Sequence, residues 1–422
     1  MEARADAGLA YMLQYEHVAW YEDGAVHILD RRVYPTKVEY VTCRDHVAVM
    51  QAIRDMVTQS AGPYTAAGMG MALAAWECRG KTAAEQMAYL HQAAETIADA
   101  RPTTRSRMAL ICDGCLNAAE AALAEGRADV DLAIREHVIR TNNRRYGKIN
   151  QVAKYLVDLF PAHGTVMTQC FGETIVGMML KEAKLAGKDI RLFCPETRPY
   201  FQGARLTATV CRDMGFDVTV ITDNMPAFVM EREGVDLFTC AADAICLDGY
   251  VVNKVGTLQI AICANHFGIP AFVTGAPDIG HPTKDTVTIE MRDPEFTLQA
   301  MGVRTAAEGV KGYYPAFDLT PPHLISGIVT DRASGVSTAG VDRSPASLDP
   351  APFFVNLPRI GGMYPGTGDL FAAVLVGKLL TGTRFSAAVT AASAFVRDVI
   401  AYSAAFDTPH RDGVLLEPCL HK

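Results

Sequence analysis

The spacing of apolar and polar residues changes along the chain. In the first 150 residues, VHILDRRVYP and VEYVTC alternate like short strands, whereas HVAVMQAIRDMV, AAEQMAYLHQAAETIADA and CLNAAEAALAEGRADVDLAIREHVI have helical spacing. Between about residues 163 and 280, the apolar runs GTVMTQC, DIRLFC, DVTVITD, LFTCAADAI and PAFVTGAPD alternate with helical segments such as GMMLKEAKLAG and LTATVCRDMG. This second pattern predicts a parallel β-sheet with helices on both faces.

These patterns predict an α/β protein with several parts. We expect a mixed, mainly helical N-terminal domain over residues 1–150 and a Rossmann-like parallel-sheet domain over residues 151–330. Residues 331–350, DRASGVSTAGVDRSPASLDP, are rich in Ser, Ala, Gly, Asp and Pro, which is typical of a linker. A last segment, residues 351–422, follows this linker.

Composition narrows the class of protein. The chain has 422 residues, of which 50% are hydrophobic and 20% charged, enough for two or three domains with real cores. The net charge of -8 argues against a nucleic-acid partner, since such proteins usually carry a basic face. A small anion held by a few local arginines remains compatible with this charge.

The sequence indicates a cytoplasmic protein. No apolar run approaches the length of a membrane span, and the start, MEARADAGLAYM, lacks the basic and apolar regions of a signal peptide. The eleven cysteines are scattered and odd in number, which fits a reducing compartment better than a disulfide framework. The spacing of CDGC at 112–115 suits a metal, but no second pair follows and the segment looks helical, so we expect no metal site there.

Polar clusters follow each of the central apolar runs. They are Cys170, the stretch ETRPYFQGARLT at 196–207, Asp223 with Asn224, Asp243, and Asp278. Because parallel strands point the same way, these clusters should meet at one edge of the sheet, where α/β proteins bind ligands. A further loop, GYVVNKVGT, adds Asn253 and Lys254.

Several of these motifs together resemble a known family. ETRPYFQGARLT, TDNM, AAD followed by NKVGT, GAPDIGHPT and EGVKGYYPAFDLTP are similar to motifs of the methylthioribose-1-phosphate isomerase family, and they occur in the same order over about residues 15–330. The wider superfamily includes ribose-1,5-bisphosphate isomerase and regulatory subunits of the exchange factor of translation initiation. The resemblance implies a homodimer that interconverts an aldose 1-phosphate and a ketose 1-phosphate without a metal, nicotinamide or other cofactor.

The resemblance also implies roles for particular residues. Cys170 would be the catalytic thiol and Asp243 the acid/base, while Arg101 would take the phosphate. Three more residues would bind the substrate: Gln202, Asn253 and Lys254. Such a substrate has a blocked anomeric carbon, so its ring must open by proton donation to the ring oxygen. An aspartate among apolar residues has the raised pKa that this donation needs, and a nearby thiol can relay the proton or stabilise the migrating charge.

Two departures from the family pattern leave the sugar open. Where the isomerases usually have Arg-Gly-Ala-Pro, which grips the phosphate, this chain has Gln59, Ser60 and Ala61. We expect these three residues to bind the substrate, with Ser60 in place of the arginine, so one positive charge is missing. The cysteine lies in QCFGET instead of His-Cys-Asn-Ala-Gly. Methylthioribose 1-phosphate, 5-deoxyribose 1-phosphate and ribose 1,5-bisphosphate are all candidate substrates.

The C-terminal segment has a resemblance of its own. PRIGGMYPGTGDLFAAVLVGKLLTG is similar to the C-terminal part of pyridoxal kinase, of the ribokinase superfamily. There the GTGD residues, here Gly366, Thr367, Gly368 and Asp369, cradle the transferred phosphate and activate the acceptor hydroxyl. Because the other half of that fold is missing, we expect an inactive remnant.

Two other functions compete with the isomerase. One is a non-catalytic subunit that senses a sugar phosphate or nucleotide, like the translation-factor relatives, which generally lack the pair of Cys170 and Asp243. The other is a kinase for vitamin B6, which the missing half argues against.

Overall fold

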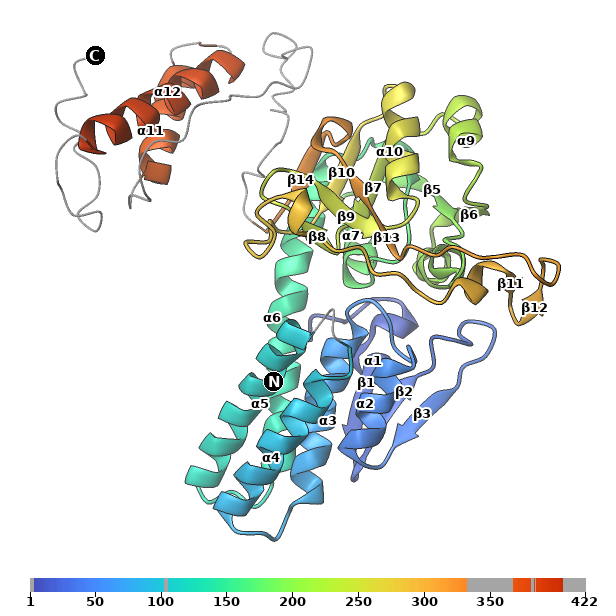
Figure 1. Ribbon diagram of the computed structural model, residues 1–422, viewed down its shortest axis with the longest axis vertical. Helices are drawn as coiled ribbons and strands as arrows, with labels where there is room; N and C mark the ends of the chain where they lie inside the picture. The colour runs from blue at the N-terminus through green and yellow to red at the C-terminus, as the bar shows by residue number, and fades with distance from the viewer. Residues whose placement is uncertain (1–3, 102–104, 332–366, 381–382, 384, 405–422) are drawn as a thin grey trace. The chain divides into compact units, whose positions relative to one another are not determined.

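The computed structural model describes residues 4–101, 105–331, 367–380, 383 and 385–404. The chain divides into two compact units, one of residues 1–324 with 328–335 and one of residues 325–327 with 336–422 (Figure 1). Within the part of the chain that the structure describes, every helix is too short or too polar to cross a membrane.

The first unit begins with a short sheet and a group of helices. The sheet is antiparallel in the order β1-β2-β3. Its strands and the helices around them are β1 Ala19–Glu22, β2 Ala25–Leu29, β3 Tyr40–Cys43, η1 Tyr11–Leu13, α1 Tyr15–Val18, α2 His46–Arg54, α3 Gly62–Glu77, α4 Ala83–Ala98, α5 Arg105–Ala124 and α6 Val130–Asp158. Of the elements predicted for this region, VEYVTC forms β3 and the first two helical runs form α2 and α4, whereas VHILDRRVYP is a strand only up to Leu29 and the run 115–139 is divided between α5 and α6. Helix α6 continues past residue 150, where we had placed the domain boundary.

Helix α3 is the centre of this helical group. It is buried on nearly all sides and contacts α2, α4, α5 and α6. Two glycines allow its neighbours to approach: a Cβ at Gly68 would lie 2.7 Å from Cγ2 of Val138, and one at Gly70 would lie 2.9 Å from Cγ1 of Val49. An all-round apolar helix has no polar stripe, so its sequence shows no helical alternation.

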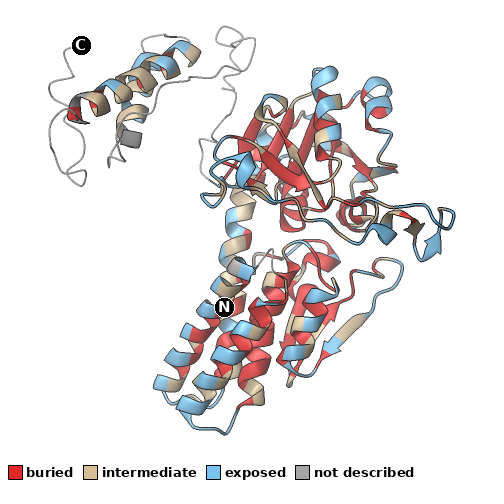
Figure 2. Cartoon of the chain, viewed as in Figure 1, coloured by how far each residue is buried: buried red, intermediate tan, exposed pale blue. Residues whose placement is uncertain are grey.

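The second half of the unit contains a six-stranded sheet in the order β14-β10-β7-β4-β5-β6. Its strands are β4 His163–Met167, β5 Asp189–Pro195, β6 Asp217–Ile221, β7 Leu237–Ala241, β10 Ala271–Thr274 and β14 Gly327–Val329. The pairs β4–β5, β5–β6, β4–β7 and β7–β10 are all parallel. The strands are buried along most of their length, except β6 at the edge (Figure 2). The predicted Rossmann-like sheet is confirmed.

Helices connect these strands in the doubly wound manner. They are α7 Thr174–Leu185, η3 Gly203–Thr207, α8 Ala208–Asp213, α9 Pro226–Arg232 and α10 Thr257–His266. Helix α7 packs on α6 and α8, whereas α9 packs on α10. In a doubly wound sheet two such sets cover opposite faces.

Smaller elements lie beyond the ends of the central strands. A three-stranded sheet has the order β13-β9-β8, and β11 and β12 form a hairpin. Their bounds, with those of the remaining short helices, are β8 Ala244–Ile245, β9 Val251–Lys254, β13 Phe317–Thr320, β11 Gln299–Ala300, β12 Val303–Arg304, η4 Lys284–Thr286, η5 Pro294–Thr297 and η6 Pro322–Leu324.

The described residues of the second unit include two helices, α11 Thr367–Leu380 and α12 Phe385–Ala404, which pack against each other. Gly366 lies outside the described residues, and so do the side chains of Thr367 and Asp369, although the helix α11 begins at Thr367. The expected resemblance of this segment to a kinase stays a prediction.

Candidate active site

The strand order places a switch point between β4 and β7. From these two neighbouring strands the sheet continues in opposite directions, to β5 and β6 on one side and to β10 and β14 on the other. Ligands of open α/β sheets bind in the crevice outside the carboxyl ends of strands at such a point. Cys170 follows the carboxyl end of β4 and Asp243 follows that of β7.

The loop of Cys170 has an unusual backbone. Cys170 has a φ of 57° and Glu173, just before α7, a φ of 53°, both in the left-handed region that residues other than glycine seldom adopt. The hydroxyl of Thr207 donates a hydrogen bond to the carbonyl oxygen of Cys170. Strain of this kind persists where the surroundings hold it in place, and it concentrates at functional sites.

Burial and neighbouring charges shift the pKa values of Cys170 and Asp243. Burial raises the pKa of the Cys170 thiol to about 11, while Lys254 acts in the opposite direction and Asp243 adds to the rise. Burial also raises the pKa of Asp243, although Lys254, Arg292 and Arg101 oppose the rise. Asp243 nevertheless has an exposed surface. A carboxyl group that is both surrounded by protein and open to solvent is placed to meet a small ligand.

Strand β9 supplies Asn253 and Lys254, both buried. The Nζ atom of Lys254 lies 4.6 Å from the centre of the Phe317 ring. Burial lowers the pKa of Lys254, and Cys170 and Asp243 counteract it. Asn253 donates from Nδ2 to Oγ1 of Thr257 over 3.0 Å. The structure thus brings Lys254 together with Cys170 and Asp243.

Residues 59–61 precede α3 and reach the same loop. Ser60 donates from Oγ to the carbonyl of Phe171 over 3.1 Å, and the backbone N–H of Ala61 donates to the Glu173 carboxylate. Glu173 also forms a fully buried ion pair with Arg31, 2.9 Å long. The carboxylate of Glu173 therefore already accepts a hydrogen bond from a backbone N–H at the start of α3. Gln59 is buried, and its Oε1 has no hydrogen-bond partner among the described residues.

Arg101 and Gln202 reach the site from two further segments. Arg101 follows α4, and burial lowers its pKa, as does the neighbouring charge of Arg292. Gln202 is buried directly before η3, a π-helical turn, and its Oε1 also lacks a partner within the described chain. A Cβ at Gly203 would lie 1.8 Å from the carbonyl oxygen of Pro195, so only glycine fits where η3 meets β5.

The two arginines of ETRPYFQGARLT bind backbone instead of pointing to a ligand. Arg205 donates to the carbonyls of Tyr34 and Arg31, and Arg198 donates to the carbonyl of Gln299 over 2.9 Å. Asp223 accepts hydrogen bonds from the backbone N–H groups of residues 197 and 198, over 2.8 and 2.7 Å. In this stretch, Gln202 has a buried side-chain oxygen without a hydrogen-bond partner among the described residues.

Sequence reasoning missed Arg292, Glu290, Tyr200 and Tyr314. Arg292 donates from Nε to Oε1 of Glu290 over 2.9 Å and lies 5.6 Å from the Tyr200 ring. Residues 290–292 belong to a stretch between β10 and β13 that forms no named strand, although residues 287–292, VTIEMR, alternate apolar and polar residues. Their contribution depends on tertiary contacts that the sequence pattern does not reveal.

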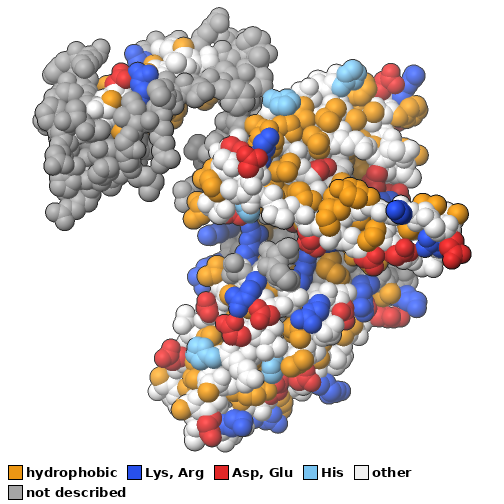
Figure 3. Space-filling view, viewed as in Figure 1, with side chains coloured by type: hydrophobic (Ala, Val, Ile, Leu, Met, Phe, Trp, Pro, Cys, Tyr) orange, Lys and Arg blue, Asp and Glu red, His pale blue; other side chains and the backbone are white. Residues whose placement is uncertain are grey.

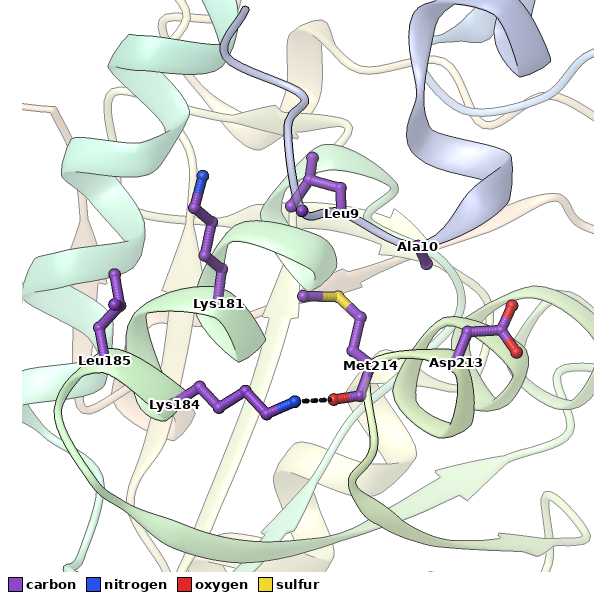
Figure 4. A pocket seen from close by; sticks show the side chains of 8 residues that line it. Leu9, Ala10, Lys181, Lys184, Leu185, Asp213 and Met214 are labelled. Atoms are coloured by element: carbon purple, nitrogen blue, oxygen red, sulfur yellow. Dashed lines mark hydrogen bonds between the residues drawn. The ribbon is translucent and has the colours of Figure 1, made fainter.

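Hollows on the surface of the described residues include the following two. One, of about 380 Å³, is lined by residues that include Leu9, Lys181, Lys184 and Met214 (Figure 4). It holds none of the predicted site residues, and Lys184 is bonded to the Met214 carbonyl over 2.8 Å. The other, of about 430 Å³, is lined in part by Gln59 and residues 199–201.

The visible surface carries no basic stripe. On the face drawn in Figure 3, Lys and Arg side chains are interspersed with Asp and Glu among the described residues. Several arginines of the described residues pair with carboxylates, such as Arg105 with Glu95 and Arg304 with Glu295.

Known proteins resemble this chain over most of its length. A sequence model of the initiation factor 2 subunit family matches residues 60–337. A methylthioribose-1-phosphate isomerase from Chloroflexus aurantiacus is 33% identical over 326 residues, which cover 74% of this chain and 93% of the relative.

Two solved structures share the fold. The 5-methylthioribose 1-phosphate isomerase from Pyrococcus horikoshii OT3 matches with a TM-score of 0.65 at 29% identity, over 75% of this chain and 91% of that one. Subunit delta of translation initiation factor eIF-2B from A. fulgidus matches with a TM-score of 0.66 at 29% identity, over 75% and 94%. Because an isomerase and a translation factor share this fold, the residues of the site must distinguish the two.

Proposed function

The chain belongs to the initiation factor 2 subunit family, and from this membership we propose that it is an aldose–ketose isomerase acting on methylthioribose 1-phosphate or a close analogue. The observation that carries the proposal is the pair of Cys170 and Asp243 at the carboxyl ends of adjacent strands, with Lys254 beside them. The extent of the match supports it, because the chain covers 93% of its isomerase relative.

The proposed chemistry begins with ring opening. A proton from Asp243 goes to the ring oxygen, the bond between C1 and that oxygen breaks with its electron pair on the oxygen, and C1 becomes electron-poor. A hydride, that is the hydrogen with its bonding electron pair, then moves from C2 to the electron-poor C1, and the C2 hydroxyl loses its proton as the ketone forms. The raised pKa of Asp243 favours the acid form that this first step requires. Cys170 relays the released proton.

The polar residues around this pair would hold the substrate. We propose that Arg101 and Lys254 bind the phosphate, and that Asn253 and Gln202 anchor sugar oxygens. Gln202 and Gln59 have buried oxygens without partners in the described chain, and a hydroxyl donor from the substrate would remove that cost. Ser60 and Ala61 are already bonded to the Cys170 loop, so their proposed role is to position it.

The alternative is a non-catalytic subunit like the translation-factor relative. Its fold match is as close as that of the isomerase. The presence of both Cys170 and Asp243 at the switch point favours catalysis, because a sensing subunit needs neither an acid nor a thiol there.

An NMR assay with three substrates tests the proposal. The purified full chain is offered methylthioribose 1-phosphate, 5-deoxyribose 1-phosphate and ribose 1,5-bisphosphate, and formation of the ketone is followed. We expect turnover of at least one of them, with methylthioribose 1-phosphate first. Failure with all three, by a chain that still binds them, would favour the sensing subunit.

We also propose that the protein is a cytoplasmic homodimer and that its C-terminal segment is a kinase-like remnant without activity. The family resemblance supports the dimer, and light scattering of the purified chain tests it. A monomer at the concentration of the assay would contradict it.

A further inference from the structure

A short segment extends the small sheet beside the active site. Residues 290–292 run next to 314–316: the N–H of Arg292 donates to the Tyr314 carbonyl over 2.9 Å, and the N–H of Ala316 donates to the Glu290 carbonyl over 2.8 Å. An antiparallel bridge joins Met291 and Pro315 between them. This ladder fixes the backbone of Arg292 next to residues 314–316, which directly precede β13.

The ladder sets Arg292 beside Lys254. Phe317 of β13 is paired with Lys254 of β9. Lys254 Nζ lies 4.6 Å and Arg292 Cζ lies 5.8 Å from the centre of the same Phe317 ring. The side chain of Arg292 is 11% exposed and held by Glu290 Oε1 at 2.9 Å. The largely buried guanidinium of Arg292 therefore lies close to Lys254, whose charge acts on Cys170 and Asp243.

The electrostatic couplings agree with this placement. Arg292 lowers the pKa of both Asp243 and Cys170, after the larger effect of burial, which raises them. It also lowers the pKa of Arg101 and of Lys254, again after burial. Arg292 is thus within reach of each of these four groups. Like charges that lie so close together in a protein are stabilised when an anion binds between them.

The loop at 59–61 offers no equivalent charge. Ser60 stands where the resembling isomerases carry an arginine, and its hydroxyl is bonded to the Phe171 carbonyl. The Ala61 N–H, which could have bound an anion at the start of α3, is taken by the Glu173 carboxylate. The cations that act on Asp243 are Lys254, Arg292, Arg101 and Arg107, and Arg292 also acts on Arg101 and Lys254.

We propose that Arg292 is a substrate-binding residue that grips the phosphate monoester together with Arg101 and Lys254. The proposal rests on the proposed function for the identity of the substrate, but the ligand chemistry, a phosphate dianion, is independent of it. The guanidinium is planar and pre-oriented by Glu290, which suits two parallel hydrogen bonds to phosphate oxygens. Glu290 competes with the phosphate for this group.

Calorimetric titration of the full chain with inorganic phosphate tests the proposal without requiring turnover. Arg292→Met should weaken phosphate binding by about tenfold or more, because a charge-assisted hydrogen bond is lost. Arg292→Lys should keep part of the affinity, since the charge remains but the fork does not. Glu290→Gln should bind phosphate at least as tightly as the unaltered chain, because it removes the competing carboxylate.

The matched control is Arg304→Met. Arg304 lies in β12, in the same irregular region, pairs with Glu295 and is 43% exposed. Its loss removes the same charge from the chain but should change phosphate affinity by less than about twofold, as expected for a surface pair. Circular dichroism and melting temperatures of all variants show which of them fold.

Three results would overturn the proposal. One is phosphate affinity in Arg292→Met equal to that of the control, and another is an unaltered chain that phosphate does not bind. A Glu290→Gln variant that loses affinity as Arg292→Met does would show that the pair is structural. If the phosphate results hold but no sugar phosphate is converted, the proposed function fails and the phosphate site stands.

Discussion

At the scale of residues, the active site is governed by where protons and positive charges lie. Burial keeps the Cys170 thiol protonated at neutral pH, with a pKa of about 11, and shifts the pKa of Asp243 upward as well. Lys254 and Arg292 act against both shifts. A bound phosphate would neutralise these cations, which would strengthen the acid form of Asp243 at the moment when a proton is needed.

Replacing the two proposed catalytic groups should stop the reaction but not binding. Cys170→Ser and Asp243→Asn change little in size and act on the transition state, so we expect turnover to be lost while substrate affinity stays within about tenfold. Steady-state kinetics and calorimetry measure the two effects. Near-normal turnover in both variants would remove the proposed mechanism.

Arg101→Ala should show the opposite pattern. The loss of a charged hydrogen bond to the phosphate is expected to cost roughly 1.5–3 kcal/mol of binding free energy. The Michaelis constant should therefore rise by a factor of about ten or more, whereas the rate of the chemical step should change less. An unchanged Michaelis constant would mean that the phosphate lies elsewhere.

At the scale of elements, two helical glycines make a matched pair. Gly68 lies in the buried α3, where an added Cβ would come within 2.7 Å of Val138 Cγ2, whereas Gly147 is exposed in α6 with nothing within 4 Å of an added Cβ. Gly68→Ala should destabilise the chain by about 1–3 kcal/mol through overpacking against a stiff valine. Gly147→Ala should stabilise it by about 0.5–1 kcal/mol.

Urea denaturation of both variants measures the difference in the free energy of unfolding. Equal effects at the two positions would mean that α3 and α6 can move apart at no cost, contrary to the packing described here.

Most elements could be predicted because their environment imposes a simple pattern. The strands β4, β5, β7 and β10 are buried apolar runs between helices. In the amphipathic helix α4, apolar residues recur about once per helical turn. Helix α3 shows no such pattern, because partners surround it on nearly all sides. Its position follows from the tertiary structure and not from local spacing.

Some residues of the candidate site could be predicted from the sequence and others could not, for the same reason. Cys170 and Asp243 were found from the sequence because they follow strands, and the resemblance gave their roles. The contact between Glu173 and the loop at 59–61 could not be found from the sequence, because it joins residues more than a hundred positions apart. Arg292 was not predicted from the sequence for a similar reason, because its position depends on the ladder between residues 290–292 and residues 314–316.

At the scale of the whole molecule, the two units should be separable in function. The predicted active-site residues with described side chains lie in the first unit, whereas α11 and α12 belong to the second. Cutting the chain near Ser344, which lies outside the described residues, should leave isomerase activity essentially intact. The full chain should not phosphorylate pyridoxal, because the missing half of the kinase fold would be needed to position both reactants.

Activity assays of the cut and full-length proteins check both statements. ATP-dependent formation of pyridoxal phosphate that disappears in Asp369→Ala would make the protein bifunctional instead.

Helix α6 has a consequence for how the first unit comes apart. It runs without interruption from Val130 to Asp158 and packs on α3 as well as on α7, while the buried pair of Arg31 and Glu173 joins the same two halves. Neither half can melt alone without fraying a shared helix and leaving a charge in an apolar interior. Residues on both sides of position 150 should therefore form one cooperative foldon, in which the slowest amide protons of the helices and of the central strands exchange with solvent together.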